Sequence, residues 1–132
     1  NAALGTTTTP PTTTINETES INTLASANLV STSGTTVNGT MSSSTDTDYF
    51  RVDLPAGKTL SATMTPNSTS DYDLYIYNSS GTLLSRSENG TGSVDSASSA
   101  NTGTTTASRY VRLVYYSGGT GSAGTYNVKL SW

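Results

Sequence analysis

Polar and apolar residues alternate with a period of two in eight separate stretches of this 132-residue chain. The stretches are residues 35–41, 48–54, 58–65, 71–78, 82–87, 92–98, 108–116 and 124–132. Breaks rich in Gly, Asn, Ser and Pro separate them, and no window after the first thirty residues sustains a helical period. The pattern predicts an all-β domain, an antiparallel two-sheet β-sandwich or jelly roll of seven or eight short strands.

The same alternation assigns the faces of each predicted strand, because side chains two residues apart lie on the same side of a sheet. The predicted inward set is Phe50, Val52, Leu54, Tyr72, Leu74, Ile76, Val111, Leu113 and Tyr115. Arg112 would be costly to bury without a partner, so the opposite side is expected to face solvent. That side carries the candidate polymer-binding residues Tyr75, Tyr77, Tyr110, Arg112 and Tyr116.

Composition changes sharply at Gly5, where a tract of Thr and Pro without apolar residues begins. Such a tract is extended and solvated, so residues 5–14 are predicted to be a linker. Residues 1–4 then belong to the end of a preceding domain, and residues 15–132 form the β-sandwich. Within that domain, residues 20–30 are expected to form a short helix or turn that directs Ile21, Leu24 and Leu29 inward.

The chain contains no cysteine and no histidine. Disulfides, thiolate metal sites, the Ser-His-Asp triad and most zinc or copper sites are therefore excluded. Its two lysines stand in no recognisable serine-lysine motif, so the many hydroxyl groups lack an activating base. Asp71 and Asp73 share a strand face about 7 Å apart, but nothing nearby supplies a sugar-binding cleft. We therefore expect no catalytic residue in this segment.

Charged residues are few: six are basic and nine are acidic, for a net charge of −3. Because the basic residues are scattered, nothing in the sequence favours binding to nucleic acid. No apolar run approaches the roughly 18 residues that span a bilayer. By contrast, 49 of the 132 residues are Ser or Thr, a composition typical of secreted bacterial modules.

Three stretches in this order and spacing resemble the bacterial pre-peptidase C-terminal domain. They read "DTDYFRVDLPAGKTL", "DYDLYIYNSSGTLL" and "RYVRLVYYSGGTGSAGTYNVKL", and the resemblance covers residues 16–132. The family is a β-sandwich appended to secreted proteases and related to the collagen-binding domains of clostridial collagenases. The resemblance implies a secreted, non-catalytic domain whose partner is its own protease catalytic domain. "NAAL", residues 1–4, is similar to the last turn of subtilisin-like catalytic domains, which favours a subtilisin-like parent over a zinc metalloprotease.

The resemblance also implies calcium, the one cofactor expected here. In related domains the segment before the first strand lies beside a loop that ends in Asp-x-Asp-aromatic, as in residues 46–49. The implied ligands are Glu17, Glu19, Asn22, Asp46 and Asp48. The chain departs from the family pattern in "NETESINT", where Asn22 is displaced and no Asp follows. The alternative is that Asp46 and Asp48 accept backbone hydrogen bonds and cap the loop.

Three functions follow as hypotheses. The domain helps secretion, maturation or control of an attached protease and is then cleaved off at the linker. Alternatively, it targets the protease to collagen or another insoluble protein through exposed tyrosines, and so raises its local concentration. In the third hypothesis the domain is a calcium-stabilised structural cap.

Overall fold

The computed structural model describes residues 13–18 and 20–132. The predicted end of a preceding domain, most of the predicted linker and the candidate ligand Glu19 lie outside these residues. The described chain forms ten strands and two 3-10 turns, η1 (Leu24–Ser26) and η2 (Gly121–Ala123). The strands are β1 (Thr14–Asn16), β2 (Asn28–Leu29), β3 (Thr35–Thr40), β4 (Thr47–Leu54), β5 (Thr59–Pro66), β6 (Asp71–Asn78), β7 (Leu83–Ser87), β8 (Asp95–Ala100), β9 (Ala107–Ser117) and β10 (Thr125–Ser131).

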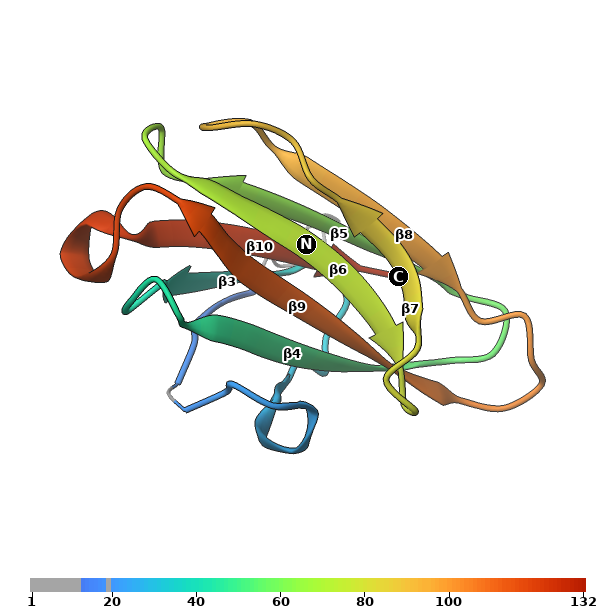
Figure 1. The fold of residues 1–132 in the computed structure, drawn as a ribbon. Helices are drawn as coiled ribbons and strands as arrows, with labels where there is room; N and C mark the ends of the chain where they lie inside the picture. The colour runs from blue at the N-terminus through green and yellow to red at the C-terminus, as the bar shows by residue number, and fades with distance from the viewer. Residues whose placement is uncertain (1–12, 19) are drawn as a thin grey trace, which may run out of the picture.

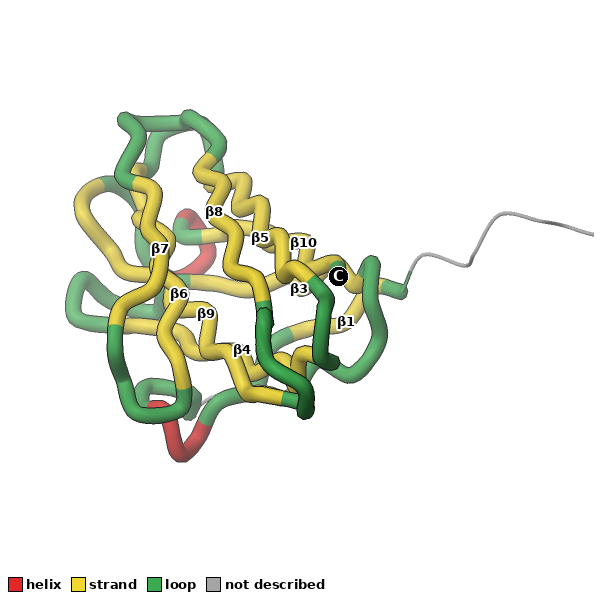
Figure 2. The backbone as a smooth tube through the Cα atoms, turned by 90° about the vertical axis from the view of Figure 1, so that its right-hand side faces the viewer, coloured by secondary structure: helices red, strands yellow, loops and turns green. Residues whose placement is uncertain are grey.

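The strands form two five-stranded sheets that pack face to face, as Figure 2 shows from the side. One sheet has the order β1-β3-β10-β5-β8 and the other has the order β2-β4-β9-β6-β7. The predicted β-sandwich is therefore confirmed, but with ten strands instead of seven or eight. Its sheets are mixed rather than wholly antiparallel, because β1 pairs parallel to β3 and β2 pairs parallel to β4.

The two additional strands explain both differences. All eight predicted strands are present, as β3 to β10. The two that were missed contain only three and two residues, too few to show an alternation in sequence. They are defined by backbone pairing to a sheet edge, which leaves no side-chain pattern to detect.

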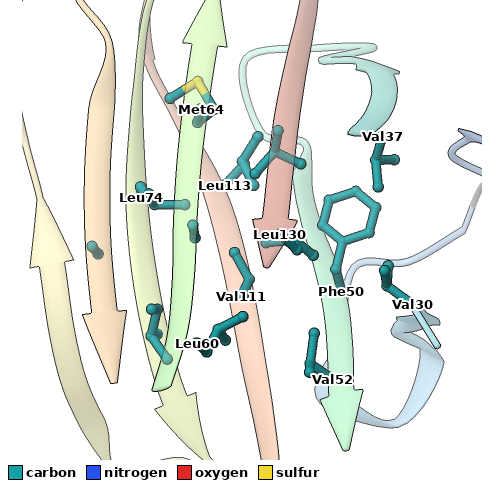
Figure 3. Close-up of a cluster of buried hydrophobic side chains, with 14 of the residues drawn as sticks. Val30, Val37, Phe50, Val52, Leu60, Met64, Leu74, Val111, Leu113 and Leu130 are labelled. Atoms are coloured by element: carbon teal, nitrogen blue, oxygen red, sulfur yellow. The ribbon is translucent and has the colours of Figure 1, made fainter. Parts of the chain in front are cut away.

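The core lies between the sheets, and Figure 3 shows residues of both sheets meeting there. Phe50, Val111 and Leu113 from one sheet are fully buried, as are Leu60 and Leu130 from the other. The predicted inward residues of β4 and β6 are all buried, and on β9 Tyr115 packs partly buried against the core. Alternation therefore assigned the sheet faces correctly.

The segment before β3 differs from its prediction. The helical element among its described residues is η1, a single 3-10 turn in which the Thr23 and Ser26 side chains each bond to the other residue's backbone. Ile21 is buried as expected, but Leu29 is 48% exposed and Val30 fills the core instead. The reason is that Leu29 lies in β2, where neighbouring side chains point to opposite faces.

Candidate functional site

Strands β4, β9 and β6 lie side by side in one sheet, and Figure 1 looks onto them. Their register brings outward-facing residues into rows across the sheet. Arg112 in β9 lies opposite Tyr49 of β4 on one side and Tyr75 of β6 on the other. In the next row Tyr110 lies opposite both Arg51 and Tyr77. We call the residues Tyr49, Tyr75, Tyr77, Tyr110 and Arg112 the tyrosine face.

Arg112 holds the centre of the tyrosine face. Its Nε donates to Thr47 Oγ1 at 2.9 Å, and its Nη1 donates to the Tyr77 hydroxyl at 3.3 Å. The guanidinium carbon lies 5.4 Å from the centroid of the Tyr49 ring, within the range of a cation–π contact. The rings of Tyr49 and Tyr75 lie 6.5 Å and 6.4 Å from that of Tyr77. The aromatic side chains therefore form one contiguous, braced surface.

The structure brings four of the five candidate polymer-binding residues together on this face. The fifth, Tyr116, is 70% exposed and lies farther along β9, where the pairing with β6 is irregular. Tyr49 was missing from the predicted set although alternation places it outward. Its membership depends on β4 pairing with β9, and that pairing cannot be read from the sequence of either strand.

A first pair of carboxylates, one buried and one half-buried, joins β4 to the chain just after β1. Asp48 of β4 is fully buried, and its Oδ2 accepts a 2.6 Å hydrogen bond from the hydroxyl of Tyr126 in β10. The same hydroxyl lies 3.2 Å from Glu17 Oε2, while Glu17 Oε1 accepts from the backbone N–H of Thr40 at 3.0 Å. Two candidate ligands, Glu17 and Asp48, therefore meet around one tyrosine hydroxyl.

The electrostatics of this cluster favour a proton on Asp48. Burial raises the pKa of Asp48 to about 9, opposed by the hydrogen bond from Tyr126 and reinforced by the neighbouring Glu17. Burial also raises the pKa of Tyr126, which keeps its hydroxyl a donor. Asp48 Oδ1 is buried and has no hydrogen-bond partner among residues 13–18 and 20–132. This oxygen is free to carry a proton or to contact a bound cation.

The other candidate ligands are engaged locally. Asp46 Oδ2 accepts from the backbone N–H of Ser42 at 2.8 Å and from its hydroxyl at 2.9 Å. With the Asn22 amide oriented to satisfy its neighbours, Asn22 Nδ2 donates to Asp46 Oδ1 at 2.9 Å and to the Thr47 carbonyl. Asp46 therefore caps its loop, as the alternative reading of this loop predicted, whereas Asp48 does not. Among residues 13–18 and 20–132, no three carboxylates are arranged to hold a metal ion.

A second carboxylate cluster, which the sequence analysis did not predict, lies near the start of β6. It comprises Asp71 and Asp73 of β6, Glu88 after β7 and Asp95 of β8. Burial and the charges of the other three raise the pKa of Asp73 to about 7. Asp95 Oδ1 accepts from the Asn89 backbone N–H at 2.8 Å, while Asp95 Oδ2 and Asp71 Oδ1 have no partner in the described part of the chain. The linear spacing of Asp71 and Asp73 did not indicate that β7 and β8 add two more acids.

Comparisons with known proteins give a structural likeness and no sequence match: no protein-family model and no curated protein matches this chain. A structure of the pre-peptidase C-terminal domain of collagenase from Bacillus anthracis superimposes with a TM-score of 0.62. It is 15% identical, and the match covers 80% of this chain and 94% of that one. A β-glucosidase from Paenibacillus barengoltzii gives a TM-score of 0.40 at 14% identity, with 91% of this chain and 13% of that one covered.

The described residues also contain no helix with the length and apolarity needed to cross a membrane. At 15% identity, the Bacillus anthracis structure establishes a shared architecture. The fold of this chain is thus a β-sandwich of the kind found in a pre-peptidase C-terminal domain.

Proposed function

We propose that this chain is a non-catalytic accessory domain that binds an extended polypeptide across the tyrosine face. The observation that carries the proposal is the grouping of four tyrosines around Arg112 on three adjacent strands, three of them with neighbouring rings. Tyrosine offers a broad apolar surface with a polar hydroxyl at a low cost in side-chain entropy, so it recurs in binding surfaces. Because Arg112 already braces these rings, little further ordering is needed when a ligand binds.

The protein to which the domain is attached is, in this proposal, a secreted protease. The structural neighbour is a domain of a collagenase, which supports a protease parent. The subtilisin-like class of that parent rests on "NAAL" alone. Binding would hold the catalytic domain on an insoluble protein such as collagen and raise its local concentration there.

Removal of the domain during maturation is the competing role for the same fold. The Thr/Pro-rich sequence of residues 5–14, predicted to be a linker, supports it, because linkers are preferred sites of proteolysis. Mass spectrometry of the active secreted parent separates the two roles. Retention of residues 15–132 supports targeting, whereas their absence from the active protease supports maturation.

Replacing two rings of the tyrosine face should abolish retention on insoluble collagen. We expect the double variant Tyr49→Ala, Tyr77→Ala to lose at least tenfold in affinity, because both rings contact other members of the face. The measurement is a pull-down of the isolated domain at increasing protein concentration. Lys129→Ala is the control, since Lys129 is exposed on β10 of the other sheet. Equal retention of the wild type and the double variant would contradict the proposal.

We further propose that the Glu17–Asp48 pair binds calcium in place of a proton. The donors are oxygens, as calcium prefers, and the unpartnered Asp48 Oδ1 supplies a free ligand position. Asn22 and Asp46 contribute only if their present hydrogen bonds open. Glu19, which lies outside the described residues, is the remaining candidate. Bound calcium would supply positive charge to a buried acidic cluster that has none.

Calcium at pH 8 should therefore raise the melting temperature of the domain. At a concentration of about 100 times the dissociation constant, the gain is about 2.7 kcal/mol, or on the order of 10 °C. The rise should disappear in Glu17→Gln and persist in Asp53→Asn, an exposed acid paired with Arg51. An unchanged melting temperature in the wild type would rule out the site.

A further inference from the structure

Tyr75 belongs both to the tyrosine face and to a pocket of about 440 Å³ beside it. Carboxylates and aromatic rings together line this pocket. We call it the acidic pocket and define it by Asp71, Asp73, Tyr75, Glu88, Tyr115 and Tyr116. A polypeptide that crosses the tyrosine face along β6 would reach the acidic pocket without leaving the surface.

The acidic pocket holds negative charge that the fold does not neutralise. In the part of the chain that the structure describes, the ion pairs are Arg51 with Asp53 and Arg86 with Glu88, the latter at 3.6 Å. Neither Asp71 nor Asp73 has a basic partner. Asp71, which lines the pocket, is only 9% exposed, and its buried Oδ1 accepts no hydrogen bond from the residues that the structure describes. A buried carboxylate in this state is costly unless a cation pairs with it.

A further buried acid makes the electrostatic potential of the pocket more negative. Asp95 is fully buried, and its Oδ2 is likewise without a partner. Its charge acts on both Asp71 and Asp73. Tyr75 donates its hydroxyl to Glu88 Oε2 at 2.7 Å, which fixes one ring against one carboxylate. A positively charged ligand would therefore meet acidic groups that it keeps ionised and the Tyr75 ring already in place.

We propose that the acidic pocket binds the guanidinium group of an arginine side chain. A guanidinium is planar, donates in a fork that matches carboxylates, and stacks on aromatic rings. Tyr116, with 70% of its surface exposed, offers such a ring beside the acids. The rings of Tyr115 and Tyr116 in the lining favour a guanidinium over a metal ion such as calcium, which prefers oxygen ligands. That the arginine belongs to a bound polypeptide rests on the proposed function, but the pocket can be tested by itself.

The test is a titration of the isotope-labelled domain with N-acetyl-arginine amide, followed by NMR at pH 7.5 and low salt. We expect chemical-shift changes centred on residues 71–75 and 115–117, with a dissociation constant in the millimolar range, about −4 kcal/mol. The citrulline analogue has the same shape without the charge and should cause no such changes. Asp71→Asn with Asp73→Asn should weaken binding at least tenfold. Asp53→Asn removes one charge elsewhere and should have no effect.

Because Asp71 and Asp73 are buried, replacing them can disturb folding, and a second variant at an exposed position tests binding without that effect. Glu88→Gln lies at an exposed position and should weaken binding at least threefold while the spectrum stays native. Equal binding of arginine and citrulline amides, or full binding by the double Asn variant, would overturn the proposal. Calcium alone causing the same shifts and displacing the arginine amide would overturn it too.

The two proposals fail in different ways. If collagen retention depends on Tyr49 and Tyr77 but arginine amide does not bind, the acidic pocket is no arginine site and the targeting function stands. If arginine amide binds but no insoluble protein is retained, the pocket stands and the targeting function fails.

Discussion

In the presence of a calcium chelator, the melting temperature of the domain should fall by on the order of 10 °C between pH 5 and pH 8. Burial raises the pKa of Asp48 from 3.8 to about 9. Between these values the folded chain keeps a proton that the unfolded chain has released, so folding takes up a proton. The free energy of unfolding is therefore greatest below about pH 4 and falls by up to about 1.4 kcal/mol per pH unit as the pH rises.

Asp48→Asn separates this effect from general charge repulsion. An asparagine mimics the protonated acid and cannot ionise, so the slope between pH 7 and pH 8 should vanish and the variant should exceed the wild type in stability at pH 8. A slope should remain between pH 5 and pH 7 from Asp73, whose pKa burial raises to about 7. Asp53→Asn changes the net charge equally and should keep the full slope. A wild-type melting temperature that is constant from pH 5 to pH 9 would refute the assignment.

The alternation of side chains made most of this fold predictable. Apolar residues such as Phe50, Leu74 and Leu113 occupy every second position of their strands, and a sandwich buries that apolar face of each strand. Strands β1 and β2 escaped prediction because backbone pairing alone defines them. Leu29 was misassigned for a related reason, since a helical period was assumed where the chain makes a two-residue strand.

The candidate sites were predictable only where local sequence decides the geometry. Tyr75 and Tyr77 face outward by alternation within one strand. By contrast, the link from Asp48 to Tyr126 spans 78 residues, and the charge of Asp95 reaches Asp73 from the opposite sheet. Gly39 is a weak sequence indication of the contact between Asp48 and Tyr126. A side chain there would collide with the Tyr126 ring, so the glycine leaves room for the hydroxyl that the two carboxylates share.

Tyr126→Phe should lower the free energy of unfolding at pH 7 by about 1–3 kcal/mol, because the buried, protonated carboxyl of Asp48 loses its partner; urea denaturation measures the change. The Tyr126 hydroxyl is the hydrogen-bond donor that Asp48 has among the described residues. Without it, a fully buried carboxyl next to Glu17 loses its donor, and the cost of burying it is no longer offset. Tyr72→Phe is the matched control, because that hydroxyl donates at 2.6 Å to the neutral carbonyl of Gly119. Its loss should cost about 1 kcal/mol.

Combining Tyr126→Phe with Asp48→Leu decides whether the carboxyl is the cause. Asp48→Leu removes the polar group that Tyr126→Phe leaves unsatisfied, and replacing both partners by apolar groups is far less costly than replacing one. The double variant should therefore be more stable than the sum of the single effects by about 1–3 kcal/mol. Strict additivity would mean that the hydroxyl and the carboxyl act independently. In that case the Tyr126 hydroxyl would not lower the pKa of Asp48, and the stability of Tyr126→Phe would fall with pH over the same range as that of the wild type.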